Sequence, residues 1–281
     1  MITIICVFSF CLVLTFVVHT VAIENCPSPN SFGLSFSNWN KQKQAVPFTF
    51  SAPSSDEEVV NFLRETKQEK VQIVGSGMSF SGVQLSDDSH MLSLHNMNKL
   101  IHIKRINDDS GDSLVEVQAG IKVRDLCEKL NDHGLAMINL GATANQTIVG
   151  AMSTGTHGTG MKLGSLGASV RGLRLITADG NIMNLTPNDG FSFQSSITGV
   201  GRLGVVTSVI LHVVPQWKMK FNMYDMSLEK LMGNLPQLIK DHPRLQWSFK
   251  PYTDNATVIL RDDVPMDTPI FPSPSPSTGD S

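Results

Sequence analysis

Residues 141–160 read Gly-Ala-Thr-Ala-Asn-Gln-Thr-Ile-Val-Gly-Ala-Met-Ser-Thr-Gly-Thr-His-Gly-Thr-Gly, and this stretch says more about the fold than any other. Its small side chains leave room for a large flat ligand, while its hydroxyl groups and exposed backbone amides supply polar contacts. We expect residues 141–167 to form a loop without regular structure. A loop of that length inside a compact domain is usually functional.

Two further glycine clusters lie before and after this stretch. Residues 75–82 read Gly-Ser-Gly-Met-Ser-Phe-Ser-Gly and follow a predicted strand at residues 71–74, and residues 199–204 read Gly-Val-Gly-Arg-Leu-Gly. One such loop by itself also fits an ordinary glycine-rich turn. A P-loop is excluded because no Gly-Lys-Ser/Thr follows, and a Rossmann fingerprint fails because Phe80 stands where the third glycine belongs. Three such loops in one domain predict backbone amides that converge on a single phosphate-bearing ligand.

The charge balance limits the partners of the chain. Its 281 residues contain 22 Lys and Arg against 25 Asp and Glu, a net charge of −3, and no basic tract. Nucleic-acid binding needs a clustered positive face, so we expect no nucleic-acid partner. For the same reason, backbone N–H groups rather than lysines must hold any bound phosphate.

Strand-like and helix-like patterns interleave without a regular alternation, which favours an α+β fold with two small subdomains over a doubly wound sheet. A capping box at residues 55–58 predicts the start of an amphipathic helix, and residues 123–130 predict another. Asp179-Gly180 lies between two strand-like runs and predicts a hairpin.

The pattern changes after Pro215, where a β-branched strand at residues 205–214 ends. A helix at residues 228–239 and strands at 245–250 and 257–261 indicate the start of a second domain. The tail from Pro265 is rich in Pro, Ser and Asp, and we expect it to be disordered.

The N-terminal residues 1–22 are apolar and carry no Lys, Arg, Asp or Glu. They predict a cleaved signal peptide or an uncleaved membrane anchor, and in either case entry into the secretory pathway. Beyond this segment the cysteines are Cys26 and Cys127. Their pairing is open, although the place of Cys127 on the apolar side of a predicted helix favours a buried thiol.

The order of these motifs resembles the vanillyl-alcohol-oxidase (PCMH) type of FAD-binding domain, and within it the sugar-lactone (aldonolactone) oxidases. The motifs are Gly-Ser-Gly-Met-Ser-Phe-Ser, Leu-Gly-Ala with Thr-Ile-Val-Gly and Ser-Thr-Gly-Thr-His-Gly-Thr-Gly, Thr-Ala-Asp-Gly, and Gly-Arg-Leu-Gly-Val-Val. The resemblance implies a lead-in at residues 23–42, an FAD-binding domain at 43–216, a partial substrate domain at 217–264 and a tail at 265–281.

By this resemblance, residues 75–79 wrap the pyrophosphate, and the central segment lines the flavin and its phosphates. Val206 lies near the adenine, and His157 contacts the cofactor or has a structural role instead of acting as a catalytic base. The cofactor-binding residues that the resemblance implies are Gly75, Ser76, Gly77, Met78, Ser79, Gly82, Gly141, Ala142, Thr147, Gly150, Thr154, Gly155, Thr156, His157, Gly204 and Val206.

Two of these positions predict how the cofactor is held and reoxidised. Family members that bind flavin covalently have a histidine where this chain has Met78, and a thioether offers no comparable nitrogen. The resemblance therefore implies dissociable FAD, with loss of flavin as the alternative. Gly141 matches the small residue found beside the flavin in the oxidases, which favours O₂ as acceptor and hydrogen peroxide as product.

The activity implied is oxidation of a sugar 1,4-lactone (L-gulono-, L-galactono- or D-arabinono-1,4-lactone) toward ascorbate-like products. The family binds its substrate with a Glu-x-Arg pair, yet the sequence holds no glutamate after Glu229, so no catalytic residue is assigned. Three interpretations stay open. The chain is a fragment or splice form of a complete oxidase, which we favour, a secreted or membrane-tethered flavin-binding module without turnover, or an incomplete product that does not fold stably.

Overall fold

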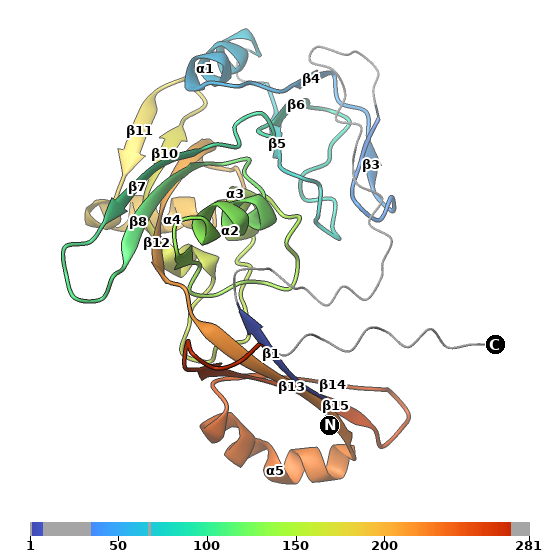
Figure 1. Ribbon diagram of the computed structural model, residues 1–281. Helices are drawn as coiled ribbons and strands as arrows, with labels where there is room; N and C mark the ends of the chain where they lie inside the picture. The colour runs from blue at the N-terminus through green and yellow to red at the C-terminus, as the bar shows by residue number, and fades with distance from the viewer. Residues whose placement is uncertain (1, 8–34, 67–68, 271–281) are drawn as a thin grey trace.

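The computed structural model describes residues 2–7, 35–66 and 69–270. These residues form two subdomains and, below them in Figure 1, a further sheet with one covering helix. Helices and sheets are both present and follow no regular βαβ order, so the α+β prediction is confirmed.

The first subdomain is built on a small parallel sheet with the order β4-β6-β5. The Ser55 side chain accepts a hydrogen bond from the Glu58 N–H (3.2 Å) and caps the helix that follows β4. Glu58 reaches back to the N–H of Ser54 (2.7 Å), one residue before the cap, instead of closing the predicted box on Ser55. The elements are β2 (Phe36–Ser37), β3 (Gln44–Ala45), β4 (Thr49–Ser51), α1 (Asp56–Glu65), β5 (Val71–Val74) and β6 (His90–Ser93).

The second subdomain is an antiparallel sheet with the order β11-β10-β12-β8-β7, and β9 also pairs with β12. Side chains alternate along β8, where Val115 and Val117 are fully buried between half-buried neighbours. The elements are β7 (Leu100–Arg105), β8 (Ser113–Gln118), α2 (Val123–Asn131), β9 (Leu135–Ala136), α3 (Ile148–Ser153), η1 (Leu166–Ser169), β10 (Val170–Ile176), β11 (Ile182–Leu185), η2 (Pro187–Asp189), α4 (Phe191–Ile197) and β12 (Val205–Pro215).

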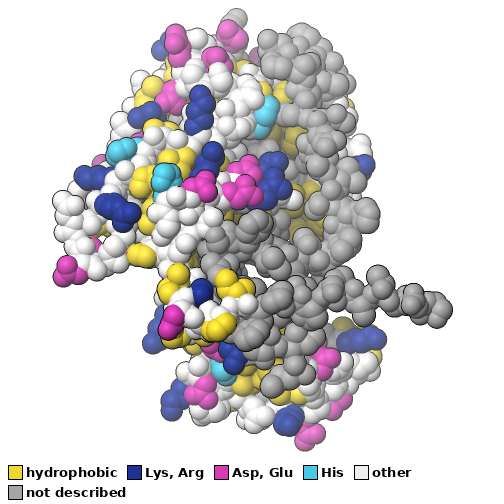
Figure 2. Space-filling view, in the orientation of Figure 1, with side chains coloured by type: hydrophobic (Ala, Val, Ile, Leu, Met, Phe, Trp, Pro, Cys, Tyr) yellow, Lys and Arg dark blue, Asp and Glu magenta, His cyan; other side chains and the backbone are white. Residues whose placement is uncertain are grey.

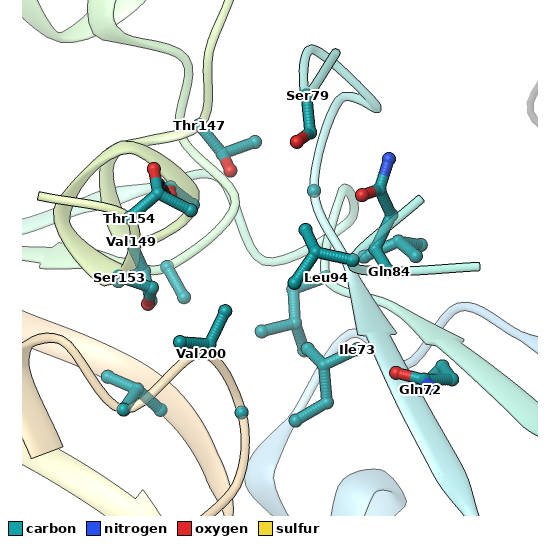
Figure 3. Close-up of a pocket in the computed structure, with 18 of the residues that line it drawn as sticks. Gln72, Ile73, Ser79, Gln84, Leu94, Thr147, Val149, Ser153, Thr154 and Val200 are labelled. Atoms are coloured by element: carbon teal, nitrogen blue, oxygen red, sulfur yellow. Dashed lines mark hydrogen bonds between the residues drawn. The ribbon is translucent and has the colours of Figure 1, made fainter. Parts of the chain in front are cut away.

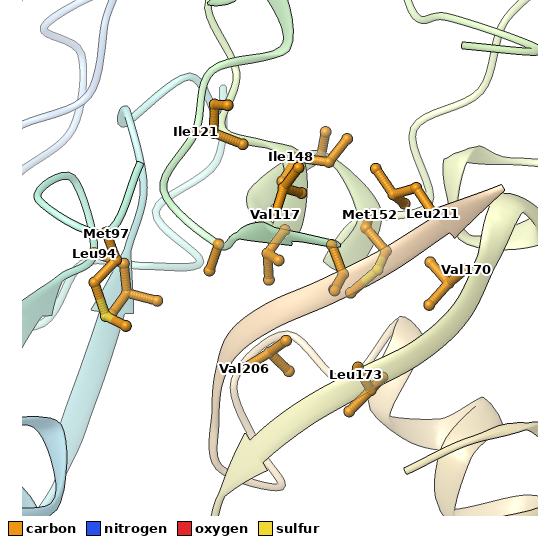
Figure 4. Packing of buried hydrophobic residues seen from close by; sticks show 14 of the residues in the cluster. Leu94, Met97, Val117, Ile121, Ile148, Met152, Val170, Leu173, Val206 and Leu211 are labelled. Atoms are coloured by element: carbon orange, nitrogen blue, oxygen red, sulfur yellow. The ribbon is translucent and has the colours of Figure 1, made fainter. Parts of the chain in front are cut away.

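A single hydrophobic core joins this sheet to the helices that cover it and to the first subdomain. Figure 4 shows Leu94 and Met97, which follow β6, on the opposite side of this cluster from Leu211. Ile148 and Met152, from α3, are fully buried in it. The core therefore fixes the two subdomains against each other.

The structure corrects the prediction that residues 141–167 form a structureless loop. Helix α3 lies within this segment, and η1 begins at its end. Residues Ile148, Val149, Ala151 and Met152 are buried, so apolar spacing over one and a half turns is enough to fold the chain here. The glycines and hydroxyls on both sides had masked that short helical pattern.

The last sheet has the order β1-β13-β15-β14, and α5 packs on one face (Figure 1). Strand β13 was not predicted, because two lysines among its first residues obscure its alternation and Pro215 lies shortly before it. The predicted boundary between residues 216 and 217 falls between β12 and β13. The elements are β1 (Ile2–Val7), β13 (Lys218–Met226), α5 (Leu228–Asp241), β14 (Arg244–Phe249) and β15 (Ala256–Val264).

Several predictions for the ends of the chain concern residues that the structure leaves undescribed. Residues 2–7 of the expected leader form β1, and residues 8–22 lie outside the described part, as do Cys26 and residues 271–281. Cys127 is half-buried on α2, and its pairing with Cys26 stays open. None of the helices within residues 35–66 and 69–270 has the length and apolarity that a membrane crossing needs.

Candidate functional site

A groove opens where the two subdomains meet, and all three glycine segments contribute to its wall (Figure 3). Its cavity volume is about 150 Å³, and it is partly open to solvent. Ligand sites typically measure about 300–1,000 Å³, so a dinucleotide would fit only with part of its length in the open groove. The predicted residues that line it are Gly75, Ser76, Gly77, Met78, Ser79, Thr147, Gly150, Thr154, Gly204 and Val206.

The first glycine loop, at residues 75–79, is held by hydrogen bonds from the hairpin that contains β2 and β3. The Asn38 side chain donates a hydrogen bond to the Ser79 carbonyl (3.0 Å), and the Trp39 N–H donates to the Gly77 carbonyl (3.0 Å). Asn38 is itself buried, and its side-chain oxygen accepts from the Lys43 N–H (3.0 Å). Two carbonyls of the loop are therefore tied to the protein, which defines the loop geometry without any ligand.

The first and second segments touch through Thr147. A Cβ at Gly75 would overlap the Thr147 hydroxyl, and one at Gly150 would lie 2.6 Å from the same oxygen. Real Cβ atoms essentially never approach that closely, so glycine at both positions is what allows the loops to meet. The result is a narrow cradle of backbone and one hydroxyl-bearing side chain.

The third loop contains a strained residue. Val200 has φ of 49°, and its neighbour Gly201 has φ of 73°. A β-branched residue in the left-handed region is a genuine outlier and costs about 1–3 kcal/mol. Val200 lines the groove and points into it in Figure 3. Strain of this kind persists where the surrounding structure imposes it, often at ligand sites.

The structure also adds groove residues to the predicted cofactor-binding set. Apolar side chains contribute much of the wall, and several amides and hydroxyls lie among them. Those at positions 199–203 belong to the third glycine segment, whereas no local pattern marks positions such as Gln84 and Leu94, which tertiary packing brings to the groove. The added residues are Gln72, Ile73, Val74, Val83, Gln84, Leu94, Ala119, Gln146, Val149, Ser153, Leu175, Ser196, Gly199, Val200, Gly201 and Leu203.

The remaining predicted residues do not line this groove; they are Gly82, Gly141, Ala142, Gly155, Thr156 and His157. Gly155, Thr156 and His157 belong to the part of the central segment that runs from α3 toward the last sheet. There the Met161 N–H donates to the Pro243 carbonyl (2.9 Å), and Gly160 bridges to Arg244. His157 is exposed, and its Nδ1 contacts the Gly158 carbonyl (3.0 Å).

His95 directly follows Leu94, which lines the groove. Burial, and then the positive charge of Lys122, lower the pKa of His95 from its usual 6.5, so this ring is uncharged at neutral pH. Lys122 pairs with Thr147 through the backbone. On the face shown in Figure 2, Lys and Arg are interspersed with Asp and Glu. Within the described residues, no group of three His, Cys, Asp or Glu could hold a metal ion.

Comparisons with known proteins first define the class. Residues 49–186 match the family model of the FAD binding domain. The fold is similar to a crystal structure of cholesterol oxidase from Brevibacterium sterolicum, with a TM-score of 0.75 at 17% identity over 86% of this chain and 49% of that one. Residues 49–186 therefore match an FAD binding domain, and the chain shares the α+β fold of that cholesterol oxidase.

Comparison with curated relatives then shows which FAD-binding proteins this chain is similar to. The chain is 33% identical to L-gulonolactone oxidase from Bos taurus over 82% of its length and 52% of the relative. It is 31% identical to the mitochondrial L-galactono-1,4-lactone dehydrogenase from Brassica oleracea over 84% of its length and 40% of the relative. The resemblance to the aldonolactone oxidases is confirmed over most of this chain. The chain spans about half the length of the curated relatives it matches.

Proposed function

We propose that the chain binds FAD without a covalent bond and forms the cofactor-binding part of an oxidoreductase that oxidises a sugar 1,4-lactone. L-gulono-, L-galactono- and D-arabinono-1,4-lactone are the candidate substrates. One observation carries this proposal: three glycine segments far apart in the sequence line one groove. The lactone oxidases and dehydrogenases among the relatives support the choice of substrate.

The residues present fit FAD at this groove. Gly75 and Gly150 let two loops meet at the Thr147 hydroxyl, which a Cβ at either position would overlap, so backbone with little side chain lines this part of the groove. The apolar walls exclude water from a flat ring system. Backbone amides of residues 75–79 would hold the diphosphate, and Thr147 would lie beside it. When bound, FAD supplies the redox chemistry by accepting two electrons as a hydride.

Met78 supports dissociable binding, because it lines the groove at the position where covalent relatives carry histidine. We propose O₂ as the electron acceptor on the basis of Gly141. A Cβ at Gly141 would lie 2.5 Å from Thr156 Cγ2, so even a methyl group would crowd this part of the chain. The support for O₂ is therefore the match of Gly141 to the small residue of the oxidases, since Gly141 packs against Thr156 and does not line the groove.

A flavin-binding module without turnover is the second candidate. It is favoured by the groove itself, because the described residues that line it come from all three glycine segments and from no part of the last sheet. For either candidate we propose entry into the secretory pathway, with membrane association if residues 1–22 stay uncleaved. N-terminal sequencing of protein made in a secreting host would distinguish cleavage from retention.

The test is to purify the chain and record its visible absorbance, then precipitate it with acid and assay the flavin in each fraction. We expect a yellow protein whose flavin remains in the supernatant. Flavin that stays with the pellet would contradict noncovalent binding. A colourless protein that fails to bind added FAD would refute the proposal as a whole. Peroxide formed with one of the three lactones would favour the oxidase over the module.

A further inference from the structure

Gln84 is a buried polar side chain in the wall of the groove. It is 9% exposed, and it lies six residues after Met78, outside the glycine cradle. Both its Nε2 and its Oε1 are buried and have no hydrogen-bond partner among the described residues. Figure 3 shows this side chain on the wall that also carries Ser79 and Leu94.

A buried amide with both groups unpaired is unusual, because the large majority of buried side-chain polar atoms in proteins are hydrogen-bonded. Leaving such a group unpaired costs its full desolvation penalty. An apolar residue of the same shape would avoid that cost at this position. The amide of Gln84 is therefore suited to a partner that enters the groove from outside the chain.

The chemistry of the amide limits that partner. A glutamine side chain presents N–H donors and a carbonyl acceptor next to each other, so it pairs with an edge that offers an acceptor beside a donor. The neighbouring groove residues Ile73, Val83 and Leu94 are apolar. Apolar walls with one polar group at the side favour a flat ring ligand. The faces of the ring would pack against the apolar side chains, and the amide would hydrogen-bond to its edge.

We infer that Gln84 forms paired hydrogen bonds with the edge of a heterocycle in the bound ligand. This inference rests on the proposed function, because FAD brings two such edges. One is the adenine edge, where an amino group adjoins a ring nitrogen, and the other is the pyrimidine part of the isoalloxazine, where an N–H adjoins carbonyls. Both edges share the donor–acceptor pair that a glutamine amide complements.

The test compares the wild-type chain with Gln84→Met, which keeps the length of the side chain and removes both polar groups. FAD affinity is measured by flavin fluorescence, and ADP and FMN affinities by competition with FAD. ADP lacks the isoalloxazine and FMN lacks the adenine. We expect FAD to bind about 10-fold more weakly to Gln84→Met than to the wild type. Of ADP and FMN, only one should show the same loss of affinity.

The ligand that weakens in parallel identifies the edge. A parallel loss with ADP assigns Gln84 to adenine, and a parallel loss with FMN assigns it to the isoalloxazine. Equal weakening of ADP and FMN overturns the inference, since it points to a phosphate or to general damage. Unchanged affinity for all three ligands overturns it as well.

Stability of the ligand-free protein provides a second readout. Because Gln84→Met removes a buried unpaired amide, the thermal midpoint without ligand should stay level or rise, while the increase produced by FAD shrinks. A lower midpoint with unchanged affinity would show that the amide is satisfied within the protein, for example by a buried water, and would refute the inference. Gln194→Met, at an exposed position on α4, is the matched control and should change neither quantity.

The two hypotheses fail in different ways. If the wild-type chain binds no FAD, the proposed function fails. If the wild-type chain binds FAD and Gln84→Met binds it equally well, only the assignment of Gln84 fails. Neither outcome depends on catalytic activity of the chain.

Discussion

The loop at residues 75–79 and the loop at residues 199–204 line the same groove but are held in place by different forces. Hydrogen bonds from Asn38 and Trp39 to two carbonyls hold the first loop. Tight backbone packing holds the third, which runs through positive φ at three of its six residues. The comparison shows two ways to rigidify a binding loop. Its backbone carbonyls can accept hydrogen bonds from a neighbouring segment, or close packing can exclude every other backbone conformation.

The two solutions differ in how they tolerate change. A loop held by hydrogen bonds loses part of its stability when one bond is removed, because the rest of the set still holds it. A loop held by steric packing cannot lose its stability in small steps, because an added methyl group either fits or displaces the backbone. Substitutions in the third loop should therefore be the more damaging.

The largest effect is expected for Gly204→Ala. Gly204 has φ of 141°, and a Cβ there would overlap the Ile176 carbonyl oxygen. Backbone strain and overpacking together should lower the free energy of unfolding by about 2–6 kcal/mol, measured by urea denaturation. Gly82→Ala is the matched control, because a Cβ at Gly82 would meet nothing within 4 Å. Equal stability of the two variants would contradict the steric account of the third loop.

A smaller effect is expected for Asn38→Ala. The substitution leaves the part-buried Ser79 carbonyl and the Lys43 N–H without their side-chain partner, and it should cost about 2 kcal/mol. FAD affinity should fall as well, because the first loop loses its clamp. Asn40→Ala is the control, since Asn40 bonds only to Gln42 within the same exposed turn. If both variants unfold at the same urea concentration, the hairpin does not hold the loop.

Local sequence patterns predicted much of the fold. The predicted strand at residues 71–74 coincides with β5, and the Asp179-Gly180 hairpin joins β10 to β11. Periodicity and turn chemistry act over a few residues, so they can be recognised in a single sequence. Helix α3 and strand β13 were missed because their patterns are short or interrupted by glycine, lysine and proline.

The site was predictable only in part, for a related reason. Glycine clusters are visible as composition, and the structure brings all three to one groove. The contact of Thr147 with Gly75 and Gly150 depends on how distant segments pack, as does the unpaired amide of Gln84. The left-handed backbone at Val200 is equally hidden, because valine disfavours the conformation it adopts. Tertiary structure overrides local preference at these positions.

The smallest predicted effect tests whether the third loop stores strain. Val200→Asn places a residue that tolerates the left-handed region where valine does not. The variant should unfold with a free energy about 1 kcal/mol higher than the wild type. Val46→Asn is the control, because Val46 is 47% exposed against 45% for Val200 and does not have positive φ.

The comparison between these two variants separates strain from exposure. Replacing an exposed valine by asparagine costs little at either site, so any gain specific to position 200 comes from the backbone. A gain in stability combined with unchanged FAD affinity would mean that the conformation, rather than the valine side chain, serves the groove. Destabilisation by Val200→Asn but not by Val46→Asn would show instead that the valine side chain packs productively, and that the third loop is held by contacts rather than by an imposed conformation.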